Sequence, residues 1–159
     1  MKKIERIIQD WCVLKGITVG VAESCTGGLL SKRLTDISGS SDYFYGGMVS
    51  YNNSVKIKLL GVKKTTLVRY GAVSDRTACE MALGVCKEMS VDIGVSITGI
   101  AGPSGATKTK PVGTVYIGIV VKKKVTSQKY RFTGTRTQIR EKAVSAALKL
   151  LKKVVSVWV

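Results

Sequence analysis

The spacing of apolar residues in the first third of the chain predicts alternating helices and strands. Apolar positions three and four apart over residues 4–14 predict a helix that ends at Gly16. The apolar run 17–22 is typical of a short buried strand, and helical spacing returns over 28–37. Aromatic, glycine and aliphatic residues alternate over 43–51, which predicts a second strand.

The rest of the chain continues this alternation, and no linker or repeat interrupts it. We therefore expect residues 1–159 to form a single α/β domain, a three-layer α/β/α arrangement with helices on both faces of a mixed central sheet. The remaining elements are predicted, in chain order, as a helix over 54–60, a helix over 77–89 behind an N-cap at Ser74, a buried strand over 92–98, a hairpin of strands 112–121 and 125–132 turned by the lysines 122–124, and a helix over 137–157.

The composition indicates where this protein is located and which bound groups it can hold. No apolar run reaches the roughly 18 residues of a membrane-spanning helix, and the N-terminal residues lack the apolar stretch of a signal peptide. We therefore expect a cytoplasmic protein without a membrane partner. The four cysteines form no CxxC pair and the chain has no histidine, so we expect no metal and no cofactor. Cys79 and Cys86 share one helical face and are expected to be core thiols.

The whole chain has a formal net charge of +16, and the positive charge is concentrated in its second half. Residues 1–92 carry 13 Lys/Arg and 9 acids, whereas residues 93–159 carry 13 Lys/Arg and one acid, Glu141. Such a field attracts phosphorylated ligands and polyanions alike, and a solvated basic surface is the simpler explanation. Candidates for binding phosphate are Lys108, Lys110, Arg136 and Arg140.

Three segments that follow predicted strands carry the candidate chemistry, namely 23–28, 50–56 and 98–105. In open α/β sheets, ligands bind outside the carboxyl ends of the strands. We therefore expect these three segments to meet at one site. In the third segment, the glycines between Thr98 and Pro103 either let the backbone approach a ligand closely or form a structural turn.

Two roles are open for Ser24, which begins the cluster Ser24-Cys25-Thr26-Gly27-Gly28. Ser24 or Thr26 can N-cap the following helix, the commonest role of such residues. Alternatively, Ser24 is a nucleophile whose oxyanion is stabilised by backbone N–H groups near Gly27 and Gly28. The glycine pair also suits a phosphate, and Cys25 is a weaker candidate nucleophile because no histidine can activate it.

A serine nucleophile needs a base, and this chain has no histidine to supply one. Lys56 can act as the base if burial lowers its pKa, as in Ser–Lys enzymes. Tyr51, five residues earlier at the same strand-to-helix turn, can relay or orient the proton. An exposed, solvated lysine is the simpler alternative for Lys56.

These segments, in this order, resemble the CinA C-terminal domain family. The resemblance rests on residues 22–28, 39–41, 51–56, 71–74, 98–103, 110–115 and 132–136. Characterised members of that family are nicotinamide mononucleotide deamidases. The resemblance therefore implies metal-independent hydrolysis of the carboxamide of this pyridine mononucleotide, which gives ammonia and nicotinic acid mononucleotide, and it implies a homo-oligomer.

The resemblance also implies roles for individual residues. The Ser–Tyr–Lys constellation of the family maps onto Ser24, Tyr51 and Lys56 as catalytic residues. Its amide-facing hydroxyl maps onto Thr98, and its substrate-binding arginine maps onto Arg136. The full set expected to bind the substrate is Thr26, Gly27, Gly28, Thr98, Gly102 and Arg136.

Two functions of other classes compete with an amidohydrolase. One is a nucleic-acid-binding module that uses the basic surface, and the other is a homologue that binds a nucleotide without turning it over. Aromatic residues are few and are not interleaved with the basic residues of the C-terminal half, so nucleic acid is the less favoured partner.

Overall fold

A five-stranded mixed sheet forms the middle layer of the structure, a computed structural model that describes residues 2–158. The spatial order is β2 (Phe44–Val49), β1 (Val19–Glu23), β3 (Ile93–Gly99), β4 (Thr114–Val121) and β5 (Lys124–Arg131). The central strand β3 and its neighbour β1 are parallel to each other, and β1 is also parallel to the edge strand β2. Strand β4 is antiparallel to both of its neighbours, β3 and β5.

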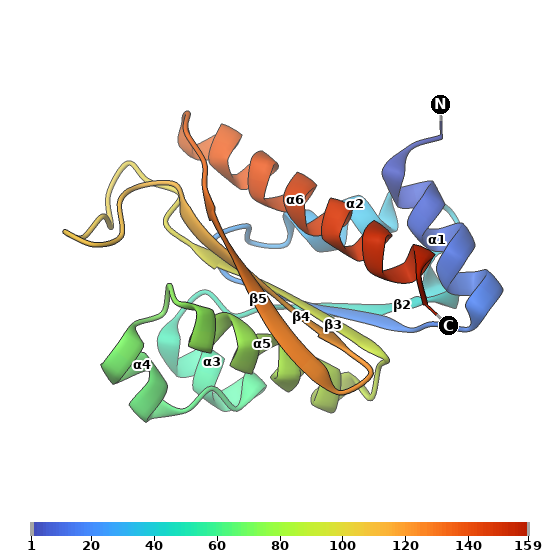
Figure 1. Cartoon of the computed structure of the whole chain (residues 1–159), viewed down its shortest axis with the longest axis horizontal. Helices are drawn as coiled ribbons and strands as arrows, with labels where there is room; N and C mark the ends of the chain where they lie inside the picture. The colour runs from blue at the N-terminus through green and yellow to red at the C-terminus, as the bar shows by residue number, and fades with distance from the viewer. Residues whose placement is uncertain (1, 159) are drawn as a thin grey trace.

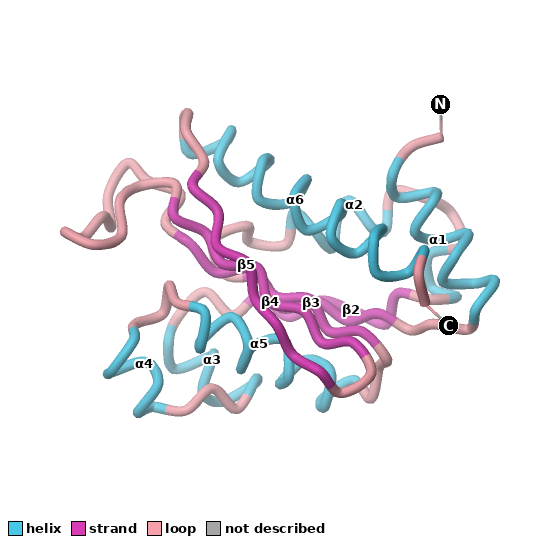
Figure 2. Tube along the Cα trace, in the orientation of Figure 1, coloured by secondary structure: helices cyan, strands magenta, loops and turns pink. Residues whose placement is uncertain are grey.

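Helices cover both faces of this sheet, so the expected three-layer α/β/α architecture is confirmed (Figures 1 and 2). One face carries α1 (Ile4–Lys15), α2 (Leu29–Thr35) and α6 (Arg136–Ser156), and the other carries α3 (Asn53–Leu60), α4 (Lys64–Tyr70) and α5 (Asp75–Met89). A short 3₁₀ turn, Ser40–Asp42, precedes β2.

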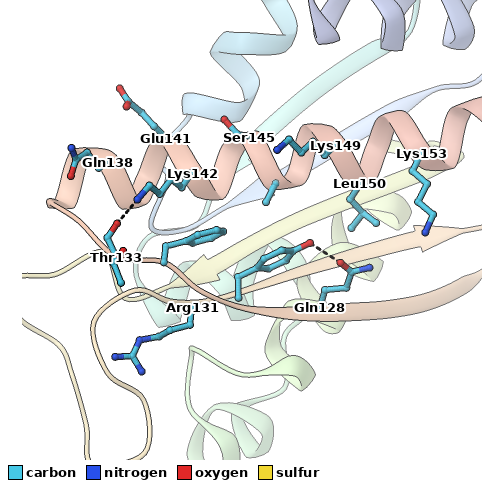
Figure 3. A pocket seen from close by; sticks show the side chains of 13 residues that line it. Gln128, Arg131, Thr133, Gln138, Glu141, Lys142, Ser145, Lys149, Leu150 and Lys153 are labelled. Atoms are coloured by element: carbon cyan, nitrogen blue, oxygen red, sulfur yellow. Dashed lines mark hydrogen bonds between the residues drawn. The ribbon is translucent and has the colours of Figure 1, made fainter.

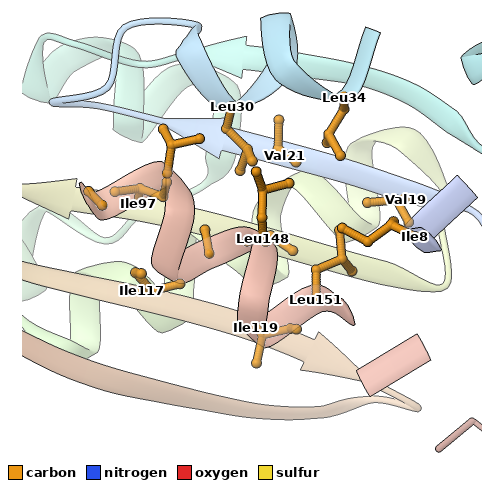
Figure 4. Packing of buried hydrophobic residues seen from close by; sticks show 14 of the residues in the cluster. Ile8, Val19, Val21, Leu30, Leu34, Ile97, Ile117, Ile119, Leu148 and Leu151 are labelled. Atoms are coloured by element: carbon orange, nitrogen blue, oxygen red, sulfur yellow. The ribbon is translucent and has the colours of Figure 1, made fainter. Parts of the chain in front are cut away.

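The larger hydrophobic core lies between the sheet and the α1, α2 and α6 layer (Figure 4). Alternate residues of the central strands, such as Val21 and Ile97, meet Leu30 of α2 and Leu148 of α6 there, and all four are fully buried. Burying each such side chain contributes about 1.5–3 kcal/mol. This packing fixes the carboxyl ends of β1 and β3 relative to α6, which is where the candidate residues lie.

Three features differ from the sequence expectations. Helix α4 was not expected; it has seven residues, of which only Thr66 is buried, so its apolar pattern is weak. The β4–β5 turn contains only Lys122 and Lys123, which both have left-handed backbone angles, and Lys124 already pairs with Val121 as the first residue of β5. This arrangement matches the two-residue turns that follow the twist of a hairpin.

The cysteines also depart from expectation. Cys79 and Cys86 are only partly buried, because they lie at the margin of the apolar face of α5, whereas the buried thiols are Cys12 and Cys25. The predicted N-cap of α5 is confirmed, since the Ser74 hydroxyl accepts a hydrogen bond from the N–H of Thr77. Within residues 2–158, no helix is both long enough and apolar enough to cross a membrane.

Candidate active site

The carboxyl ends of β2, β1 and β3 lie next to one another, and the three segments expected to meet at one site do so there. Together with the first turn of α6 they enclose a cavity of about 300 Å³. Within residues 2–158, no group of three or more His, Cys, Asp or Glu side chains is placed to hold a metal ion. Seven residues singled out from the sequence border the cavity: Ser24, Cys25, Tyr51, Lys56, Thr98, Gly102 and Arg136.

Lys56 is the buried centre of this site, with only 1% of its surface exposed. It lies in the first turn of α3, which Asn52 caps by accepting a hydrogen bond from the N–H of Ser54. The Lys56 amine donates to the carbonyl oxygens of Ser50 at 2.7 Å and Tyr51 at 3.2 Å. Its third neighbour is the Ser24 hydroxyl, at 3.0 Å from Nζ to Oγ. The alternative of a solvated surface lysine is therefore wrong.

Burial lowers the pKa of Lys56 below its ordinary value of 10.5, because desolvation disfavours the ammonium form. The two carbonyl oxygens can only accept hydrogen bonds, so they fix two N–H bonds of the amine. In the neutral amine, the remaining position is the lone pair, and it faces the Ser24 hydroxyl. This is the geometry that a general base requires.

Ser24 and Thr26 do not cap α2, so that alternative is also wrong. The buried carboxylate of Glu23 takes this role and accepts hydrogen bonds from the N–H groups of Gly28, Leu30 and Ser31 at 3.2, 3.0 and 2.8 Å. It also accepts from the Ser31 hydroxyl at 2.8 Å. Because Glu23 satisfies the start of the helix, the Ser24 hydroxyl is left for Lys56.

The N–H groups expected to stabilise an oxyanion are already committed. The N–H of Gly27 donates to the carbonyl oxygen of Ser24 at 3.1 Å, and that of Gly28 donates to Glu23. Thr26, Gly27 and Gly28 do not border the cavity, and Thr26 is fully buried. Gly27 and Gly28 therefore shape the turn after Ser24, and their assignment as oxyanion donors is corrected.

Tyr51, in the loop between β2 and α3, and Arg136, at the start of α6, are hydrogen-bonded to each other at the cavity. The Tyr51 side chain is 58% exposed, and its phenol oxygen accepts a hydrogen bond from Nη2 of Arg136 at 2.7 Å. Nη1 of the same guanidinium donates to the carbonyl oxygen of Gly102 at 2.8 Å. The backbone carbonyl of Tyr51, rather than its phenol, contacts Lys56. A role of the phenol as proton relay stays a prediction.

Thr98 is buried at the end of β3, and its hydroxyl donates to the carbonyl oxygen of Ala72 at 2.7 Å. This bond uses the hydroxyl proton, so the Thr98 oxygen is left as an acceptor. Gly102 has a left-handed φ of 76°, and a Cβ there would lie 2.5 Å from Val112. A side chain at Gly102 would thus displace the loop that Arg136 holds.

Burial raises the pKa of the Cys25 thiol to about 11, so this thiol is protonated near neutral pH. Cys25 borders the cavity but is the weaker nucleophile on this ground. Two of the suggested phosphate ligands bind the protein instead. Lys110 donates to the carbonyl oxygen of Tyr70, and Arg140 donates to the carbonyl oxygens of Cys25 and Thr26.

A larger groove, of about 840 Å³, lies between β5 and α6, away from Ser24 and Lys56 (Figure 3). The Tyr130 and Phe132 rings stack in it, with centroids 5.4 Å apart and planes at 11°. Lys149 and Lys153 of α6 border the same groove, and neither has a carboxylate partner within the described chain. The expectation that aromatic and basic residues are not interleaved is therefore wrong for this surface.

Fold and site together define an α/β protein with a buried serine–lysine pair at the carboxyl ends of parallel strands. The chain belongs to the CinA C-terminal domain family, whose model matches residues 1–155. The family expected from the sequence is thus confirmed.

Curated relatives carry names of this family. A putative competence-damage inducible protein of Caldicellulosiruptor saccharolyticus is 47% identical over 96% of this chain, and a CinA-like protein of Nostoc punctiforme is 56% identical over 86% of it. The chain spans 37% and 33% of the lengths of these two relatives.

Solved structures of other proteins superpose on this chain over nearly their whole length. The competence damage-inducible protein A of Klebsiella pneumoniae superposes with a TM-score of 0.94 at 28% identity, covering 98% of this chain and 97% of that one. The competence/damage inducible protein CihA of Agrobacterium tumefaciens gives 0.88 at 38% identity, covering 97% and 96%.

Proposed function

We propose that this chain is an amidohydrolase that deamidates nicotinamide mononucleotide to nicotinic acid mononucleotide and ammonia. The observation that carries the proposal is the 3.0 Å contact between Ser24 Oγ and the buried amine of Lys56, whose pKa is lowered by desolvation. A pair of this kind supplies both nucleophile and base without histidine. The pyridine substrate comes from the family resemblance rather than from the shape of the cavity.

In the proposed reaction, neutral Lys56 takes the proton of Ser24 as Oγ attacks the carboxamide carbon. The resulting ammonium then donates a proton to the leaving nitrogen, and ammonia departs. Water, deprotonated by the same amine, then attacks the acyl carbon; the bond from this carbon to Oγ breaks, Lys56 returns the proton to Ser24, and nicotinic acid mononucleotide leaves. The Thr98 oxygen can accept a hydrogen bond from the carboxamide NH₂, because its own proton is bound to Ala72.

We infer that Arg136 binds the rest of the substrate. Its guanidinium links Tyr51 to the Gly102 loop at the cavity, so a phosphate entering there would meet a fixed positive charge. Arginine suits this role because its planar fork can bind phosphate through two parallel hydrogen bonds. We also propose a cytoplasmic location, as the amino-acid composition indicates, and a homo-oligomer, as the resemblance implies.

The test is ammonia release from nicotinamide mononucleotide by the purified chain and by two variants. Ser24→Ala should abolish turnover, and Lys56→Met should lower kcat by about 10²–10⁴-fold, the usual contribution of a general base. Lys58→Met is the matched control, since Lys58 is an exposed lysine of the same helix. Near-normal turnover by either site variant would refute the assignment.

The groove between β5 and α6 supports a second candidate function, the binding of single-stranded nucleic acid. Partly buried aromatic rings lie beside Lys149 and Lys153 in this groove, which Glu141 also borders, and aromatic and basic side chains together are typical of such sites. A fluorescent single strand should bind in a salt-sensitive way, and Lys149→Glu with Lys153→Glu should weaken this binding while leaving ammonia release unchanged. Equal binding by the double variant would exclude the groove.

A further inference from the structure

Arg140 of α6 holds the backbone directly after Ser24. Its Nε donates to the carbonyl oxygen of Cys25 at 3.1 Å, and its Nη2 donates to the carbonyl oxygen of Thr26 at 2.9 Å. The donor of both hydrogen bonds is the positively charged guanidinium, so these bonds are stronger than hydrogen bonds between neutral groups. Gly27 follows these two carbonyls with a left-handed φ of 57°, and a Cβ there would lie in ordinary contact with Nη2, at 3.4 Å.

The contact with Arg140 fixes the direction of the N–H of Thr26, and the hydrogen bond from Gly27 to Ser24 within the same turn fixes that of the N–H of Cys25. The peptide bonds of this turn are trans, so each C=O and the following N–H point in opposite directions. The N–H of Thr26 therefore points away from Arg140, opposite the held carbonyl of Cys25. In the same way the N–H of Cys25 points away from the Ser24 carbonyl, which accepts the N–H of Gly27.

These two N–H groups are the open donors of the turn. Those of Gly27 and Gly28 are committed to Ser24 and Glu23, whereas those of Cys25 and Thr26 donate to no other residue in the described part of the chain. Cys25 borders the cavity beside Ser24. A backbone N–H directly after the nucleophile is a recurrent oxyanion donor in serine hydrolases.

We propose that Arg140 is a positioning residue, which holds the turn after Ser24 so that the N–H of Cys25 stabilises the oxyanion formed on attack by Ser24. The inference rests on the proposed function only in taking Ser24 as the nucleophile. As the bond from Oγ to the carbonyl carbon forms, the C=O electron pair moves onto oxygen and the Ser24 proton passes to Lys56. Arg140 touches neither substrate nor proton and acts through the backbone.

The experiment compares Arg140→Met, Arg140→Lys and Arg140→Ala with the wild-type chain, using Lys152→Met, an exposed change on the same helix, as control. Two substrates are used: nicotinamide mononucleotide, followed by ammonia, and p-nitrophenyl acetate, followed by nitrophenolate release. The ester forms the same kind of oxyanion on Ser24 but does not depend on the pyridine nucleotide. Thermal unfolding of each variant reports whether it remains folded.

For Arg140→Met we expect kcat to fall by about 10²-fold with KM changed less than about threefold, the pattern of an interaction made in the transition state. Arg140→Lys, which can hold only one carbonyl at a time, should lie between this variant and wild type. The midpoint of the pH–rate profile should not move, since Lys56 is untouched. Free guanidinium should restore part of the activity of Arg140→Ala but none to Ser24→Ala.

Turnover by Arg140→Met within twofold of wild type would overturn the inference, as would a shifted pH midpoint or no rescue by guanidinium. If Arg140→Met fails to fold, Arg140→Lys decides, and an unchanged kcat in that variant counts against the role. A wild-type chain that releases nitrophenolate but no ammonia defeats the proposed substrate and leaves Arg140 to be judged on the ester. Release of neither product overturns both proposals.

Discussion

Glu23→Gln should destabilise the fold and slow the chemistry together, because one buried carboxylate both starts α2 and frees Ser24. Its four hydrogen bonds come from three N–H groups and one hydroxyl, at 2.8–3.2 Å. Glutamine is nearly the same shape but presents one acceptor oxygen and one NH₂ donor. With its oxygen turned toward Gly28 and Leu30, its NH₂ faces the N–H of Ser31, and that donor loses its partner.

The size of the effect follows from these bonds. An unpaired buried N–H costs about 1–3 kcal/mol, and the bonds that remain weaken because the acceptor is no longer charged. Removing the cost of burying a charge offsets part of this loss. We therefore expect a net loss of about 3–5 kcal/mol in the free energy of unfolding. For a chain of this length, that loss corresponds to a fall in Tm of about 10 °C.

Thermal and urea unfolding of Glu23→Gln, with Glu88→Gln as an exposed control, measure this loss, and ammonia or nitrophenolate release measures the effect on Ser24. The control should stay within about 0.5 kcal/mol of wild type. A Tm of Glu23→Gln equal to that of the control would refute the view that this carboxylate holds the turn. A lower Tm with an unchanged kcat in the folded variant would refute its link to Ser24.

Two further predictions concern the base and the packing. The kcat/KM of the wild-type chain should rise with pH through a midpoint below 10.5, because only the neutral Lys56 amine accepts the Ser24 proton and burial lowers its pKa; a rate that does not fall as the pH decreases through this range would contradict the role. Gly84→Ala should cost about 3 kcal/mol in urea unfolding, despite the better helix propensity of alanine, because its Cβ would lie 2.0 Å from the Leu60 carbonyl oxygen where α5 crosses α3. Gly61→Ala, where a Cβ meets nothing but φ is 65°, should cost only about 1 kcal/mol from backbone strain; equal losses in the two variants would show that close packing is not the cause.

The sequence predicts the fold well because burial and local periodicity coincide in most elements. The apolar runs of β1 and β3 and the stripe of α6 are predicted to within two residues, since these segments form the main core. Helix α4 is missed because it buries too little to impose a pattern. The pairing of Ser24 with Lys56 is predictable for a different reason: both follow parallel strands, and the residue types suit each other chemically.

The parts of the site that could not be predicted depend on which donor meets which acceptor. Glu23 ends a strand, and nothing in the sequence states that its carboxylate accepts the N–H groups of Leu30 and Ser31. The oxyanion assignment to Gly27 and Gly28 fails for this reason, because their N–H groups are used inside the turn. An acidic residue just before a glycine-rich helix start is the one sequence signal that could have indicated this.

The basic residues of α6 have different environments, and we therefore expect different roles for them. Arg136 and Arg140 are one turn apart, and each donates to backbone carbonyls of a different loop: Gly102 for the first, Cys25 and Thr26 for the second. Lys149 and Lys153, further along the same helix, face the groove. Neutralising the partly buried Arg140 should therefore affect catalysis at any ionic strength, whereas neutralising the exposed lysines should change only salt-sensitive binding, because exposed charges are screened and partly buried ones much less so.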